Sequence, residues 1–120
     1  MTPLMAKQAA DILAARGVSP RILADGPEGL LARWAAFVSE AAAGYSFGLE
    51  DYRNDLDLRT LIAHAGLSDL AAVDDQRFRD LLQGDAPVWS SDAPDAWWTR
   101  GYPSNSGPVL LQDLRAEGLL

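Results

Sequence analysis

The chain has 120 residues, no cysteine and a formal net charge of −7. This length fits one domain that buries enough surface to fold on its own, and the lack of cysteine excludes disulfide bonds and thiolate metal sites. The excess of carboxylates disfavours nucleic acid and anionic lipid as direct partners, because phosphates repel it.

The first 25 residues predict a helical extension. Thr2 and Pro3 are typical of a helix start, because threonine caps free N–H groups and proline fits the first helical position. Gly17 is a candidate for the helix end, and Ser19-Pro20 repeats the start signal for a short second piece. The apolar residues of the first helix recur at helical spacing and are Met5, Ala9, Ile12 and Leu13.

Residues 27–84 predict a helical core of three helices. The first follows a turn at residues 25–28 and ends at Gly44, and its apolar positions are Leu30, Trp34, Phe37, Val38 and Ala41. The second runs from Leu49 to about Ala65. The third is expected to start at Ser68, to contain a break with a fresh N-cap at Asp74-Asp75, and to end at Gly84. Its inward positions are expected to be Leu70, Val73, Phe78, Leu81 and Leu82.

Residues 85–107 show no sustained helical or strand period and contain three prolines. We expect an ordered loop, because large aromatic residues are scarce in disordered chains and this segment contains Trp89, Trp97, Trp98 and Tyr102. One helical turn is expected near residues 92–94, and Pro108 starts a short C-terminal helix over 108–118. The sequence therefore predicts one all-α domain, 1–120, of about five helices with a long aromatic loop before the last one.

The acidic excess lies between Gly48 and Trp98, because acids and bases cancel in the segments on either side. Within it, the helix starting at Leu49 carries Glu50, Asp51, Asp55 and Asp57, which we expect to form an acidic surface. A second interpretation is that the helix neutralises itself, since Arg59 lies four residues from Asp55 and Asp57 lies four residues from Arg53. In that case the excess serves solubility alone.

Few residues are suited to catalysis or to metal binding. His64 is the only histidine, and Asp57, Thr60 and His64 share one side of the helix, so a proton relay is geometrically conceivable. The motif of a serine nucleophile elbow is absent, and we expect no metal or cofactor. The glycine- and serine-containing run 101–108 precedes a helix and could hold an anion on its N–H groups, although it lacks the lysine of a phosphate-binding loop.

The Trp97-Trp98-Thr99-Arg100 segment is the other candidate contact site. Trp and Arg are enriched at binding hot spots, and in one interpretation one tryptophan anchors the loop while the other faces a partner. Alternatively, both tryptophans are buried and Arg100 pairs with the acidic helix, which would hold the loop in place.

Three motifs resemble those of a group of small bacterial proteins. The motifs are D-Y-x-N-D-L-x-x-R from Asp51 to Arg59, D-x-R-F from Asp75 to Phe78, and W-W-x-x-x-x-P from Trp97 to Pro103. The resemblance covers residues 30–103, and the chain departs from it in Gly101-Tyr102 and in the N-terminal extension. The group has no assigned activity, so the resemblance implies a bacterial source and a common unit of acidic helix and W-W segment, but no chemistry.

These observations favour a non-enzymatic, protein-binding role in the bacterial cytoplasm. An acidic immunity protein or antitoxin would use such a charge distribution to capture a basic partner, since complementary charge speeds association. The N-terminus carries Lys7 and Asp11 where a signal peptide needs an apolar run, and no stretch suits a membrane span. The alternatives are a small enzyme or ligand-binding domain, with a pocket between the acidic helix and the Trp-Trp loop, and a homodimeric scaffold.

Overall fold

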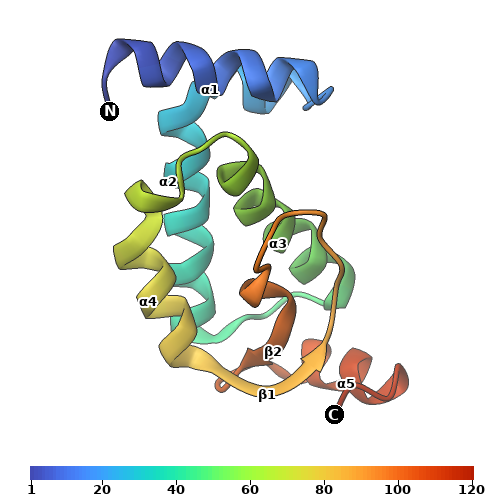
Figure 1. The fold of residues 1–120 in the computed structure, drawn as a ribbon. Coiled ribbons are helices and arrows are strands. Elements are labelled where there is room, and N and C mark those ends of the chain that lie inside the picture. Colours follow the sequence, from blue (N-terminus) through green and yellow to red (C-terminus); the bar gives the residue numbers. More distant parts are fainter.

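The computed structural model describes residues 1–120 and is mostly helical (Figure 1). Helix α1 (Pro3–Ala15) crosses one end of the long helix α2 (Pro20–Gly44), and α3 (Leu49–His64) and α4 (Ala72–Leu81) flank α2. The remaining elements are η1 (Ser68–Ala71), β1 (Leu82–Pro87), η2 (Trp97–Thr99), β2 (Arg100–Pro103) and α5 (Pro108–Ala116). No helix combines the length and the apolar character that crossing a membrane requires.

The N-terminal helices begin and end at the predicted residues. The Thr2 hydroxyl accepts a hydrogen bond from the Met5 N–H at 3.1 Å, and Gly17 after α1 has a φ of 72°. The turn predicted at residues 25–28 appears as a break inside α2, because Gly26 takes a φ of 70° that other residues rarely adopt. The chain therefore changes direction at Gly26, and the second part of α2 runs on through the centre of the molecule (Figure 1).

An aromatic cluster forms the centre of the core, as the helical periodicity of α2 predicts. Trp34 and Phe37 are buried, and their ring centroids lie 5.4 Å apart. Phe78 packs edge-on against Trp34 at 5.3 Å, and Tyr45 and Tyr52 lie 5.8 and 5.9 Å from Phe37. These rings hold α2, α3 and α4 together, and such pairs contribute about 0.5–1.5 kcal/mol each beyond their burial.

The prediction for the third core helix is wrong in its details. The segment starts as the short helix η1, α4 begins after Ala71, and Asp74-Asp75 lie in the first turn of α4 instead of capping it. The helix ends at Leu81, and Gly84 lies in strand β1. The predicted inward residues Leu70 and Val73 are 45% and 76% exposed. The apolar spacing alone does not reveal this break, because the 3₁₀ turn of η1 rotates the residues before α4 out of phase.

The prediction of a mostly helical fold is confirmed, but the fold is not purely α-helical, because the segment predicted as a loop contributes to a pair of strands. Strands β1 and β2 form an antiparallel pair, with Leu82 opposite Pro103 and Gln83 opposite Tyr102, and an irregularity before the next pair. Gly101 has a φ of 78°, and a Cβ there would lie 2.7 Å from the Gln83 carbonyl oxygen. The pairing therefore depends on glycine, and its irregularity hides the strand alternation that a sequence reading uses.

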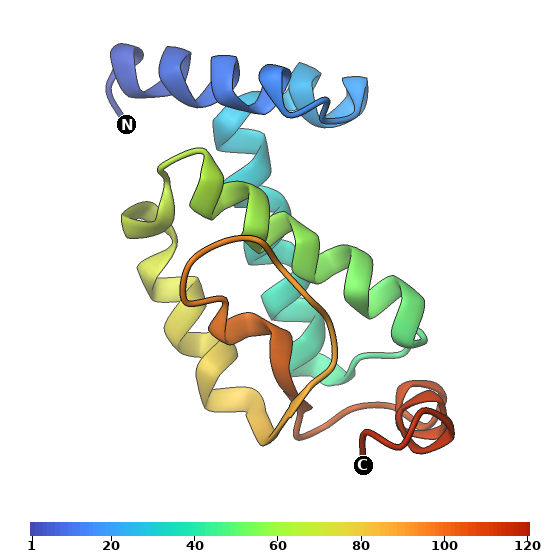
Figure 2. The same ribbon diagram turned by 45° about the vertical axis from the view of Figure 1, so that its right-hand side comes forward.

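The segment between the strands lies over α3. We name residues 88–98 the strap (Figure 2 shows it in orange across the helix). The strap is closed at its base by the Val88 N–H, which donates to the Thr99 carbonyl at 2.8 Å. Its helical turn is η2 (97–99), which starts at Trp97 instead of near the predicted residues 92–94. The segment is thus ordered, as its aromatic content predicts, and α5 follows from the predicted start at Pro108.

Candidate functional site

One side of α3 holds the strap along its length. Four α3 side chains at steps of three or four residues each meet a successive strap residue, so helix and strap run in the same direction (Figure 2). The hydrogen bonds are Arg53 Nε to Val88 O at 2.8 Å, Trp89 Nε1 to Asp57 at 2.7 Å, Thr60 Oγ1 with Ser91 Oγ at 2.8 Å, and His64 Nε2 with Asp92 at 2.7 Å. The side of the helix that carries Asp57, Thr60 and His64 therefore attaches the strap, and His64 meets a carboxylate instead of a serine.

A buried ion pair lies beneath the strap. Arg59 donates two hydrogen bonds to the Asp75 carboxylate, at 2.8 and 2.9 Å, and the Trp34 indole donates a third at 3.0 Å. The Arg59 guanidinium also lies 4.7 Å from the Trp98 ring, whose indole N–H donates to Thr60 Oγ1 at 3.1 Å. This network joins residues from all three sequence motifs, so the motifs have a structural role in the core.

The ion pairs predicted within the acidic helix do not form. Arg59 binds Asp75 instead of Asp55, and Arg53 binds Glu117 of α5 instead of Asp57. Helical spacing permits the predicted pairs, but long-range partners compete for the same guanidinium groups. A bidentate contact in a buried site is the stronger interaction for Arg59, since water does not screen it.

Asp55 is half-buried beside the end of α2. Its carboxylate accepts a hydrogen bond from the Tyr45 hydroxyl at 2.8 Å. Burial raises the pKa of Asp55, and the nearby charges of Glu40 and Asp51 raise it further, whereas the Tyr45 bond opposes the rise. The same burial and the neighbouring carboxylates raise the pKa of Tyr45. Asp55 therefore belongs to the predicted acidic surface, but its carboxylate is half-buried and already bonded to Tyr45. Its charge repels those of Glu40 and Asp51.

Asp92 connects the strap to two helices. It pairs with His64 of α3 and with Arg16, directly after α1, at 2.7 and 3.1 Å. The hydrogen bond from His64 and that from Arg16 lower the pKa of Asp92. The contact is exposed, so it fastens the strap without burying charge, and it gives His64 a positional role.

The predicted contact residues at the Trp-Trp segment separate into core and surface. Trp98 is 2% exposed, so it anchors the strap in the core. Trp97 is half-buried, lies under the Arg79 guanidinium at 4.1 Å, and lines a shallow cavity of about 400 Å³ with Arg100. Arg100 donates to the Asp85 carbonyl at 3.4 Å, so the predicted pairing with the acidic helix is wrong.

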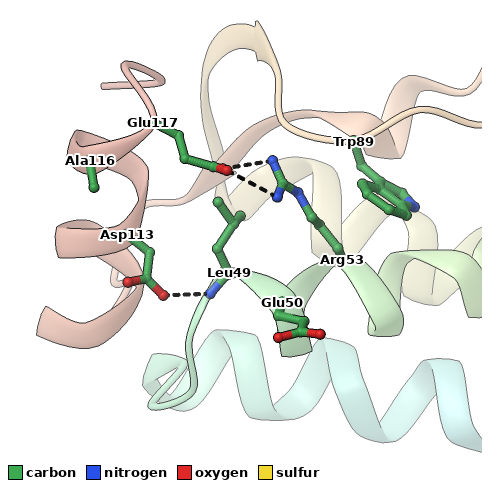
Figure 3. Close-up of a pocket in the computed structure, with 7 residues that line it drawn as sticks. All are labelled: Leu49, Glu50, Arg53, Trp89, Asp113, Ala116 and Glu117. Carbon is green, nitrogen blue, oxygen red and sulfur yellow. Dashed lines mark hydrogen bonds and ion pairs between the residues drawn. The ribbon is translucent and has the colours of Figure 1, made fainter.

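An open cavity of about 480 Å³ lies where the start of α3, the strap and α5 meet (Figure 3). Arg53 crosses it, stacked 5.3 Å from the Trp89 ring and bound to Glu117 at 2.8 Å. Asp113 accepts the Leu49 N–H at 3.0 Å, which takes the place of a side-chain cap at the start of α3. Leu49, Glu50 and Ala116 complete the lining (Figure 3).

Glu50 and Asp51 are the two predicted acidic residues that remain available. Both are exposed, and neither makes a hydrogen bond or an ion pair with another side chain. Exposed apolar residues lie close by: Trp89 is 36% exposed, Phe47 is 51% exposed, and Val109 is 49% exposed next to Gly48. We name these residues, together with Asp113 and Glu117, the acidic–aromatic face.

The sequence predicts only Glu50 and Asp51 of this face. Trp89 belongs to the predicted aromatic loop without a marked contact role, and no sequence pattern marks Phe47, Asp113 or Glu117. The sequence carries little sign that these residues lie together, because each is in a loop, short connector or short helix. The position of such a segment against α3 is set by the tertiary packing. The connector 45–48 is tied to the run before α5 by the Gly107 N–H, which donates to the Tyr45 carbonyl at 2.8 Å.

Other candidate chemistries find little geometric support. In the run 101–108 that could hold an anion, the N–H groups of Ser104, Ser106 and Gly107 donate to backbone carbonyls. No three histidine or acidic side chains converge as metal ligands do. A scan of protein-family models and searches of curated proteins and of solved structures found no match. The function is therefore inferred from the geometry of the chain itself.

Proposed function

We propose that this chain is a non-enzymatic, acidic protein-binding domain that uses the acidic–aromatic face to capture a basic partner. The observation that carries the proposal is an open cavity lined by the unpaired Glu50 and the exposed ring of Trp89, with Asp51 and Phe47 exposed at neighbouring positions of the chain. Aromatic residues supply contact area at interfaces, and a rim of one charge sign speeds association with an oppositely charged protein.

The charge balance of the face favours a cationic contact. The one cation that lines the cavity beside this face, Arg53, is already bound to Glu117, and Asp113 is bound to a backbone N–H. The carboxylates of the face without a partner are Glu50 and Asp51, and a lysine or arginine of a partner would neutralise them. Within this class, a bacterial immunity protein or antitoxin that neutralises a basic toxin in the cytoplasm is the specific role we propose.

A second candidate is small-ligand binding at the same cavity. Its volume of about 480 Å³ falls in the usual range for ligand sites of roughly 300–1,000 Å³. It is lined by Glu50 and Arg53 of α3 and by Trp89 of the strap, and the Trp97-Trp98 pair lies outside it. A cationic or amphipathic small molecule would suit the aromatic wall and the carboxylates.

A pull-down with matched charge reversals tests the proposal. The Glu50→Lys/Asp51→Lys variant is compared with Glu28→Lys/Asp69→Lys, which changes the net charge equally at exposed residues that make no ion pair. We expect the wild type and the control to recover the same basic protein from an extract of the source cells, with recovery falling as salt rises. Equal recovery by the Glu50/Asp51 variant would sink the proposal. A cationic small molecule that binds Trp89 without any protein partner would favour the second candidate.

A further inference from the structure

Helix α1 carries an apolar stripe that the rest of the chain does not cover. Only Ala9 and Leu13 of this helix are buried against the body. On the adjoining side, Leu4 is 65% exposed, Met5 is 38% exposed and Ile12 is 39% exposed. A 13-residue helix is marginal on its own, so its exposed apolar side needs a reason beyond local helix stability.

The spacing of the stripe is that of a helix-pairing seam. Met5, Gln8, Ile12 and Ala15 follow one another at steps of three, four and three residues, and all four are exposed. Such 3–4 spacing places them in one line along the helix, as the a and d positions of a coiled coil are placed. Leu4 widens the line on one side. The seam therefore has the geometry that receives another helix.

The net charge around α1 differs in sign from that of the rest of the chain, which bears on which helix can pack against it. Residues 1–25 contain Lys7, Arg16 and Arg21 against Asp11 and Asp25, which leaves a net charge of +1. Because the whole chain has a net charge of −7, residues 26–120 carry a net charge of −8. Two copies of this chain repel one another over most of their surface, and least where α1 meets α1. A basic partner, in contrast, is drawn to the other end of the molecule.

We propose that α1 is the interface of a homodimer, in which the seam of one copy packs against the same seam of a second copy, with the two helices parallel on either side of a two-fold axis. The seam contains one polar residue, Gln8, which is self-complementary because its side-chain amide both donates and accepts hydrogen bonds. In such a parallel isologous contact, each seam residue meets its own copy. Gln8 therefore pairs with Gln8 of the second copy and fixes the register of the two helices.

This arrangement leaves the acidic–aromatic face free. Helices α1 and α5 lie at opposite ends of the molecule in both views, and the longest dimension of the chain is 43 Å (Figures 1 and 2). A dimer through α1 therefore presents two such faces pointing away from each other. The dimer does not depend on the binding role proposed for that face, and each stands or fails separately.

The mass in solution tests the interface. Light scattering coupled to size exclusion, from micromolar to millimolar protein, should give the dimer mass for the wild type and the monomer mass for Met5→Glu/Ile12→Glu. The control Leu70→Glu/Val73→Glu adds the same charges at exposed apolar positions of η1 and α4, and it should remain a dimer. Circular dichroism verifies that each variant is folded. A wild type that is monomeric throughout, or a dimer that survives Met5→Glu/Ile12→Glu, would overturn the proposal.

Cross-linking gives a second readout that leaves the apolar residues intact. The chain has no cysteine, so Gln8→Cys introduces a single thiol within the seam. We expect oxidation to convert most of this variant into a covalent dimer, while Ala14→Cys, exposed on the other side of α1, stays mainly monomeric. Equal cross-linking of both variants would indicate random collision and contradict the two-fold interface.

Discussion

The two ends of α3 carry similar residues in opposite situations. Towards its C-terminal end, Arg59 and Thr60 are buried, and Asp57 and His64 are fastened to the strap. At its N-terminal turn, Glu50 and Asp51 are exposed and unpaired, and Glu50 lines the open cavity. The comparison teaches that the role of a polar residue depends on whether the fold supplies a bonding partner for it. A charged group that is paired within the fold is no longer available to bind another molecule.

The largest expected effect is the loss of the buried ion pair. Asp75→Ala leaves Arg59 charged and unpaired in the core and deprives the Trp34 indole of its acceptor. We expect the free energy of unfolding in urea to fall by about 3–5 kcal/mol. The matched control Asp69→Ala, at an exposed carboxylate without an ion pair, should stay within about 0.5 kcal/mol of the wild type. Similar losses of unfolding free energy for both variants would mean that the buried, paired carboxylate contributes no more to stability than an exposed, unpaired one.

A smaller loss is expected where the helix holds the strap. Thr60→Val keeps the shape of the side chain but leaves the buried Trp98 indole N–H without an acceptor. The unfolding free energy should fall by about 1–3 kcal/mol. Ser91→Ala removes the hydrogen bonds of the Ser91 hydroxyl with Thr60 and with the Ala93 N–H but leaves the Trp98 indole its acceptor, and it should cost less. If Ser91→Ala cost more than Thr60→Val, the indole bond would not be the main fastening.

The pH dependence of stability tests Asp55, which lies between the two situations. Because burial raises its pKa, the stabilising contribution of its protonated form is complete below the unfolded value near 3.8 and is lost as pH rises through the folded pKa. Asp55→Asn keeps an acceptor for the Tyr45 hydroxyl and removes this loss. Urea unfolding at a series of pH values should show the variant gaining on the wild type from pH 3.8 upward. A constant difference would mean that Asp55 does not titrate with folding.

Asp92 supplies the opposite sign for the same measurement. Its pKa is lowered by His64 and Arg16, so its contribution to stability is present above pH 3.8 and is lost as pH falls through the folded pKa. Asp92→Asn should therefore narrow its difference from the wild type as the solution becomes more acidic. A difference that widens on acidification would contradict the assignment of Asp92 as a fastening of the strap.

The smallest effect on stability is expected at the exposed end. Glu50→Gln/Asp51→Asn removes two charges from the first turn of α3, where the helix dipole favours them and neighbouring carboxylates repel them. We expect these opposing effects to leave the unfolding free energy within about 0.5 kcal/mol of the wild type. The same variant should weaken capture of a basic partner. A large stability loss would mean that these acids serve the fold instead of the binding face.

The sequence by itself determined the helices and much of the core. Thr2 and Gly17 limit the first helix through local backbone chemistry, and the spacing of Leu30, Trp34 and Phe37 marks the buried side of α2. These features follow from interactions within a few residues, so a single chain segment contains all the information they need. The ordered aromatic segment was likewise predictable from its composition.

Only the tertiary structure decided which charges are free and where the strands lie. The spacing of α3 allowed Arg59 to pair with Asp55, but the folded chain brings Asp75 closer in a buried site. The irregular pairing of β1 with β2 depends on the approach of Gly101 to the Gln83 carbonyl, which no periodicity records. The acidic–aromatic face arises because α5 and the strap meet the start of α3. Contacts between residues far apart in the chain are set by the packing of whole elements, and local spacing does not specify them.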